Sequence, residues 1–153
     1  MQGKCEALPK TVELTSYWSA MRNDNFTTGT AAGEADAVAS GYSRVRVEGY
    51  AFETQQPGTV PLRSFWSATR NDNFTTGTAA GANDARAAGY SSVRTEGYAY
   101  ESQQPGTVAL KSYWSAMRND NFTTATKAGE DDAVAAGYNY VRIEAWVLTK
   151  PNP

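Results

Sequence analysis

The stretch that decides the fold is Trp18-Ser19-Ala20-Met21-Arg22-Asn23-Asp24-Asn25-Phe26-Thr27-Thr28, which returns almost unchanged at residues 66–76 and 114–124. Trp18, Trp66 and Trp114 mark the three copies, and both intervals are 48 residues (66 − 18 and 114 − 66). Self-similarity at a fixed period of about 20 to 50 residues is typical of repeat architectures. The sequence therefore predicts three copies of one structural unit.

The repeat extends over almost the whole chain of 153 residues, a length that favours one domain. Residues 16–63 are identical to residues 64–111 at 36 of 48 positions, and residues 16–57 are identical to residues 112–153 at 27 of 42 positions. We therefore predict an N-terminal extension and a single domain of three repeats. Their bounds are 1–8 for the extension and 9–153 for the domain, with repeats at about 9–56, 57–104 and 105–153.

The predicted fold class is α+β, mainly β, with one short helix in each 48-residue unit. Three units suit a closed pseudo-threefold ring better than an open array, because an open array needs distinct polar caps at its ends. The ring is expected to be either trefoil-like or three-bladed and propeller-like. In such a ring the segment after Leu8 is expected to pair with residues 141–148.

The middle copy shows the pattern expected within one unit. Residues 59–66 are β-rich and residues 73–76 follow a turn, which predicts a hairpin. Residues 78–88 are rich in alanine and predict a helix of about three turns, with Thr76 or Thr78 as its cap and Gly89 at its end. A long strand follows each helix, and in the first copy its alternation of apolar residues changes phase, which predicts a bulge or bend at Gly49.

Composition excludes several classes of function. The chain has no histidine, so histidine bases, Ser-His-Asp or Cys-His catalysis and histidine metal ligands are absent. Its single cysteine, Cys5, precludes an internal disulfide or a multi-thiolate zinc site and is predicted to be dispensable for stability. We accordingly predict neither enzymatic activity nor a cofactor nor a metal.

The charge pattern excludes two classes of partner. A net charge of −2 and a sequence pI near 5.2 argue against general binding to nucleic acid or to anionic membranes. No apolar run is long enough to span a membrane, so no membrane insertion is expected. The start of the chain has no apolar signal-peptide segment. The expected location is nevertheless extracellular or at the cell surface, with the cytoplasm as the alternative.

The motif order resembles a known family. Each unit carries an Asp-Asn-Phe-Thr-Thr core, a Gly-Tyr pair and, after the first two units, a Gln-Pro-Gly-Thr-Val turn. This is similar to a three-copy tandem repeat domain of unknown function found in bacterial secreted and cell-wall-associated proteins, with Asn25, Asn73 and Asn121 where that family has histidine. The family often accompanies glycan-cleaving or peptide-cleaving modules, so the resemblance implies attachment or carbohydrate recognition.

The residues themselves suggest one sugar-binding pocket in each unit. Neighbours on a strand point to opposite faces, so one of Tyr17 and Trp18 is expected in the core and the other at least partly exposed. An exposed ring forms an apolar wall for a sugar, while amide and carboxylate groups meet its hydroxyls. The predicted ligand-binding residues are Trp18, Asn23, Asp24, Asn25, Trp66, Asn71, Asp72, Asn73, Trp114, Asn119, Asp120 and Asn121. The predicted function is a trivalent, lectin-like module whose partners are glycans on a cell surface or cell wall.

Three other interpretations remain open. The charged residues common to all copies, which include Arg22, Asp24, Asp36, Arg46 and Glu48, also suit a network of ion pairs and turn caps. The whole module could be a structural or adhesive one that makes protein contacts. Calcium ligation by the Asn-Asp-Asn segment and a glycosidase pair of Asp24 and Glu48 are weaker hypotheses.

Overall fold

The computed structural model describes residues 8–153, so the prediction about Cys5 lies outside the described residues. The described chain is mainly β, with 49% strand and 18% helix. Each unit contributes a strand, a short strand, a helix of 9 residues and a long strand. The elements are β1 Thr11–Ser19, β2 Asp24–Thr28, α1 Ala31–Ala39, β3 Ser43–Phe52, β4 Thr59–Ser67, β5 Asp72–Thr76, α2 Ala79–Ala87, β6 Ser91–Tyr100, β7 Thr107–Ser115, β8 Asp120–Thr124, α3 Lys127–Ala135 and β9 Asn139–Leu148.

The predicted hairpin and helix are both confirmed. β4 pairs antiparallel with β5, and Trp66 lies directly opposite Asn73. Of the two predicted caps, Thr78 is the one used: its side chain accepts a hydrogen bond from the Gly81 amide. Gly89 follows the helix with φ +85°, the left-handed conformation that glycine adopts without a steric penalty.

The phase change in the long strand is confirmed as a bulge, one residue before the predicted position. Leu14 pairs with Gly49 while Thr15 pairs with Val47, so Glu48 is the extra residue. The bulge turns the Glu48 side chain inward, and the residue is 2% exposed. Glu96 and Glu144 occupy the same bulge in the other two units.

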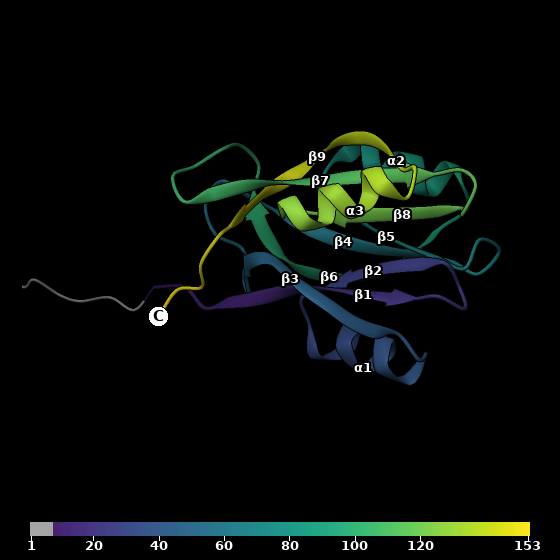
Figure 1. Ribbon diagram of the computed structural model, residues 1–153. Coiled ribbons are helices and arrows are strands. Elements are labelled where there is room, and N and C mark those ends of the chain that lie inside the picture. Colours follow the sequence, from purple (N-terminus) through teal and green to yellow (C-terminus); the bar gives the residue numbers. More distant parts are fainter. Residues whose placement is uncertain (1–7) are drawn as a thin grey trace, which may run out of the picture.

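The nine strands form one antiparallel sheet, and each helix contacts the short strand of its own unit: α1 with β2, α2 with β5 and α3 with β8. In Figure 1 α1 lies below the strands, and α3 lies in front of β7 and β8. β3 pairs with β6 and with β9, and β6 also pairs with β9. The expected pairing of the segment after Leu8 with residues 141–148 is wrong, because β1 pairs with β3 of its own unit. The two ends still meet: the Asn152 side chain donates to the Pro9 carbonyl at 2.9 Å.

The apolar core has one shared part and three local parts. Leu14, Leu62 and Leu110 are fully buried in a cluster drawn from all three units. Each unit adds a local cluster, such as Tyr17 and Phe26 beneath helix α1. Tyr17 is 5% exposed and Trp18 is half-buried, as the strand alternation predicts.

Equivalent hydrogen bonds join the units in a cycle. The Thr75 hydroxyl donates to the Thr27 carbonyl, the Thr123 hydroxyl to the Thr75 carbonyl, and the Thr27 hydroxyl to the Thr123 carbonyl, at 3.0 to 3.2 Å. All three bonds are buried. Every unit therefore contacts both of the others.

Candidate ligand clefts between the units

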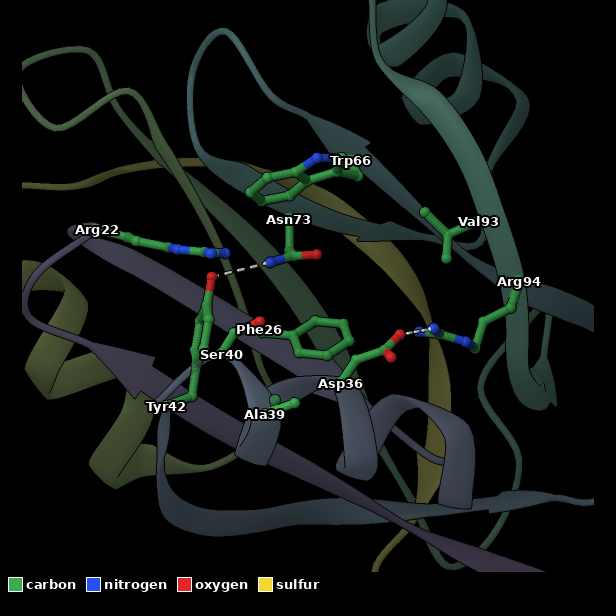
Figure 2. Close-up of a pocket in the computed structure, with 11 residues that line it drawn as sticks. Arg22, Phe26, Asp36, Ala39, Ser40, Tyr42, Trp66, Asn73, Val93 and Arg94 are labelled. Carbon is green, nitrogen blue, oxygen red and sulfur yellow. Dashed lines mark hydrogen bonds and ion pairs between the residues drawn. The ribbon is translucent and has the colours of Figure 1, made fainter.

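Three equivalent clefts lie where one unit meets the next. Figure 2 shows the first cleft, between units 1 and 2, with Arg22 and Tyr42 from unit 1 and Trp66 and Arg94 from unit 2. The second cleft lies between units 2 and 3, and the third lies between units 3 and 1. Their volumes are about 390, 230 and 530 Å³ in that order. Each of these three clefts is lined by residues of two units.

An arginine between two aromatic rings forms one end of each cleft. The guanidinium carbon of Arg22 is 5.7 Å from the centroid of the Tyr42 ring and 5.5 Å from that of the Trp66 ring. Tyr42 belongs to the same unit as Arg22, whereas Trp66 comes from the next unit. Corresponding stacks recur in the other two clefts around Arg70 and Arg118. These cation–π contacts hold neighbouring units together and position the arginine.

An asparagine beside each tryptophan presents its carbonyl oxygen. The Asn73 amide nitrogen donates to Asp24 at 2.6 Å and to the Tyr42 hydroxyl at 3.2 Å. The two acceptors are themselves hydrogen-bonded to each other, so both lie on the nitrogen side of the amide and fix the orientation of the group. Among the described residues no donor reaches the Asn73 Oδ1 atom, and Figure 2 shows that oxygen turned away from Tyr42. The cleft thus contains an acceptor that is held in place and open to a ligand.

A bridged arginine lies at the other end of the first cleft, away from Arg22 (Figure 2). Arg94 pairs with Asp36 of the preceding unit and, at 3.2 Å, with the buried Glu96. Glu96 in turn accepts a hydrogen bond from the Gly29 amide at 3.0 Å. The Asp36 carboxylate is 64% exposed, so it is available to solvent or to a hydroxyl group.

The predicted site aspartates lie outside the clefts. Asp24, Asp72 and Asp120 are 0% exposed and bring carboxylate oxygens within 4.8 Å of one another. Asp24 accepts a hydrogen bond from the backbone N–H of Asn73, at 3.0 Å. It also accepts one from the Tyr42 hydroxyl. As placed, these aspartates have no surface to offer a ligand. They support the cleft by holding its asparagine and tyrosine.

Burial and mutual repulsion control the charge of this aspartate cluster. The pKa of Asp24 is raised to about 8, mainly by the loss of hydration on burial and secondly by repulsion from the neighbouring Asp120 carboxylate. The same two causes raise the pKa of Asp72 and of Asp120 to about 8. Burial and the adjacent Asp24 also raise the pKa of the Tyr42 hydroxyl, so it remains a donor. At neutral pH the cluster therefore retains protons.

The aspartate cluster is also the group of residues, within 8–153, whose geometry could hold a metal ion. Both oxygens of each carboxylate already accept hydrogen bonds from asparagine or tyrosine donors. The cluster thus has hydrogen-bond donors within the protein on its carboxylate oxygens. Of the two weaker hypotheses, calcium ligation gains the Asp24 cluster as a candidate place, whereas the glycosidase pair gains no geometry, since neither Asp24 nor Glu48 lines one of the three clefts.

The structure divides the predicted site residues into three groups. The tryptophans and the asparagines that follow the aspartates line the clefts: Trp18 and Asn25, Trp66 and Asn73, Trp114 and Asn121. The aspartates form the buried cluster. Asn23, Asn71 and Asn119 form the hairpin turns, with φ of 52° to 54°, and line none of the three clefts.

Sequence reasoning left three kinds of cleft residue out of the site. These are the stacked arginine, the tyrosine of the Gly-Tyr pair and the bridged arginine, represented in the first cleft by Arg22, Tyr42 and Arg94. Their recurrence in every unit was a usable signal. What the sequence lacks is any sign that Arg22 and Tyr42 face a tryptophan of the neighbouring unit, or that Arg94 pairs with Asp36 of the preceding one.

The fold and the clefts define a class: a β-rich repeat module with ligand-sized clefts between its units. Residues 13–148 match the family model described as "Domain of unknown function (DUF5648)", and the chain belongs to this family. No curated protein and no solved structure matches the chain. Within residues 8–153, no helix is long and apolar enough to cross a membrane.

Proposed function

We propose that this protein is a non-catalytic carbohydrate-binding module with three equivalent sites, one in each cleft between units. The observation that carries the proposal is the threefold recurrence of a cleft that combines a half-buried tryptophan with oriented polar groups. Sugar-binding sites need an apolar wall for the C–H face of the ring and donors and acceptors for its hydroxyls. Each cleft offers both.

The first cleft supplies these groups in a usable arrangement. The Trp66 ring provides the apolar wall, Asn73 Oδ1 accepts a hydrogen bond, and Arg22 donates. Asp36 provides a second acceptor at the far end. All four side chains are held by contacts within the protein, which lowers the entropic cost of binding.

The proposal includes a closed pseudo-threefold arrangement of the units. Three facts support closure: the cyclic threonine bonds, the mutual pairing of β3, β6 and β9, and the existence of a third cleft between units 3 and 1. In such a ring all three sites belong to one rigid body. Binding to a surface that carries many glycans is then much tighter than binding to one free sugar.

Titration of the protein with a panel of free sugars, followed by NMR of the tryptophan indole N–H signals, tests this function. The chain has four tryptophans, and Trp146 lines none of the three clefts, so it serves as an internal control. We expect a bound sugar to shift the signals of Trp18, Trp66 and Trp114, with dissociation constants in the millimolar to high micromolar range, about −4 to −6 kcal/mol. A panel in which no sugar shifts these signals would overturn the proposal.

A blocking variant assigns binding to a particular cleft. Ser40 is exposed and lines the first cleft, so Ser40→Phe is expected to fill it and to leave two sites of three. The Trp66 signal should then stop responding while those of Trp18 and Trp114 still shift. The matched control is Thr54→Phe at an exposed position that lines none of the three clefts; it should keep all three sites.

Adhesion through protein contacts is the second candidate function, and one observation favours it. Met21 and Met117 at the hairpin tips are each 96% exposed, and Val38 and Val134 on α1 and α3 are each 68% exposed. The middle unit has Thr69 and Arg86 at the corresponding positions. Exposed apolar side chains on two units of three suit a protein partner. Loss of partner binding on changing these four residues, with sugar titrations unchanged, would support this alternative.

The proposal also covers location and chemistry. Glycans on a cell surface or cell wall are the partners, which places the module outside the cell. The proposal does not include catalysis, because a glycosidase needs a pair of carboxylates at its site. The first cleft is lined by a single acidic residue, Asp36. Release of product from a chromogenic glycoside by the purified protein would contradict this part of the proposal.

A further inference from the structure

The three stacked arginines differ from the bridged arginines in their ion pairs. Within residues 8–153, no carboxylate lies within ion-pair distance of Arg22, Arg70 or Arg118. The bridged arginines differ in this respect, since Arg94 contacts two carboxylates. Each cleft therefore has one arginine whose charge is balanced and one whose charge is not.

The stacked arginines keep N–H donors that a ligand can use. The guanidinium carbon of Arg22 lies over the Tyr42 and Trp66 rings, at 5.7 and 5.5 Å from their centroids. A guanidinium carries five N–H donors, more than these contacts use. An arginine that is already held in this way loses little further conformational entropy when a ligand binds. Its planar fork matches the two oxygens of a carboxylate.

The nearest acidic groups do not neutralise this charge. Tyr42 separates Arg22 from Asp24, because the tyrosine hydroxyl donates to that carboxylate. The raised pKa of Asp24, about 8, keeps the aspartate cluster largely protonated at neutral pH. Asp36 lies at the other end of the cleft, engaged with Arg94 (Figure 2).

We infer that the clefts select sugars that carry a carboxylate, with the carboxylate at the stacked arginine and the ring against the tryptophan. This inference rests on the proposed function. The polarity of the cleft orients the ligand: the Arg22 end receives the anion, and Asn73 Oδ1 and Asp36 accept hydrogen bonds from hydroxyl groups. A charge-assisted bidentate contact of this kind contributes about 10-fold or more in affinity.

Matched acidic and neutral ligands distinguish selection of carboxylate-bearing sugars from the proposed sugar binding in general. The probes are the methyl glycosides of glucuronate, galacturonate and mannuronate, their neutral counterparts methyl glucoside, galactoside and mannoside, and sodium acetate as a carboxylate without a ring. We expect at least one acidic glycoside to bind about 10-fold or more tightly than its neutral counterpart. That preference should weaken in 0.5 M NaCl, because salt screens the charge contact. Acetate should bind much more weakly than the acidic glycoside.

Each other outcome is decisive. Neutral glycosides that bind as tightly as the acidic ones would overturn this inference and leave the proposed function standing. Failure of every glycoside to bind would overturn both. Acetate that binds as tightly as the acidic glycoside would overturn the inference, because the ring would then contribute nothing.

The variant arm uses two triple variants with the same change of net charge. Arg22→Gln, Arg70→Gln and Arg118→Gln together should abolish the preference for the acidic glycoside. The control, Arg44→Gln, Arg63→Gln and Arg86→Gln, changes exposed arginines that line none of the three clefts and should retain it. Equal loss in both triple variants would overturn the inference. The comparison of ligands on the unchanged protein stands whether or not the variants fold.

Discussion

The stability of the fold is expected to fall as the pH rises from 5.5 to 7.5, which is opposite to the usual acid sensitivity of proteins. The cause is the aspartate cluster, whose three pKa values are raised to about 8 by burial and by mutual repulsion. In the unfolded chain the same carboxyl groups titrate near about 3.9. Between these values the folded state binds more protons than the unfolded state, so the free energy of unfolding decreases with increasing pH.

The magnitude follows from proton linkage. Each additional proton held by the folded state gives a slope of about −1.4 kcal/mol per pH unit. One retained proton thus lowers the free energy of unfolding by about 2.7 kcal/mol over two pH units, which corresponds to a decrease of about 5 to 11 °C in Tm for a domain of this size. The groups facing the cluster are the hydroxyls of Tyr42, Tyr90 and Tyr138, with raised pKa values, so they stay protonated in this window.

Urea unfolding, followed by tryptophan fluorescence at pH 5.5, 6.5 and 7.5, measures the effect. The chain has no histidine, so little else titrates in this window. Asp24→Asn removes one titrating group and should make the slope shallower. Asp131→Asn, an exposed carboxylate paired with Lys127, is the matched control and should leave the slope unchanged. A free energy of unfolding that is level or rises over this range, or an equal slope in Asp24→Asn, would refute the reasoning.

Three further predictions concern stability. Thr15→Val should stabilise the protein by about 1 kcal/mol in urea unfolding, because the Thr15 hydroxyl is buried with no partner among the described residues; a destabilised variant would show that the hydroxyl is satisfied. Gly81→Ala should destabilise by about 1 to 3 kcal/mol, although alanine normally favours a helix, since its methyl would lie 1.8 Å from the Thr76 hydroxyl; an unchanged Tm would contradict this close packing. Treatment with EDTA should leave Tm at pH 7 unchanged, whereas a decrease would show that a cation rather than protons balances the aspartates.

Much of each unit could be predicted from local sequence. Thr78 and Gly89 mark the ends of the helix through capping chemistry that acts within a few residues. The bulge was predicted to within one residue, because a change of period locates the extra residue only to a neighbouring position. A shift of one residue has a large effect here, because the extra residue of the bulge is Glu48. Its carboxylate therefore lies inside the protein, where it accepts a hydrogen bond from the backbone amide of Ala125 in the third unit.

The partners between units could not be predicted in this way. Asp24 lies in an Asn-Asp-Asn segment with the composition of a turn, and local sequence favours a role in closing the hairpin. Its actual partner, the Asn73 amide, is 49 residues away and belongs to the next unit. Arg22 was grouped with the ion-pair network for the same reason, whereas the structure stacks it on Trp66 of the next unit. Recurrence identified these residues as important, but recurrence does not say which unit a side chain faces.

The location of the clefts makes their formation depend on assembly of the units. A single 48-residue unit contains half of two different clefts: unit 2 gives Trp66 to the first and Arg70 to the second. The residues that join the units are the same residues that form the clefts, as the Arg22–Trp66 stack shows. The aspartate cluster then supports every cleft from behind, since Asp24 orients both Tyr42 and Asn73. Three copies of one unit thereby form three clefts only when all three are folded together, and this explains why charged residues with no access to solvent recur as faithfully as those that line the clefts.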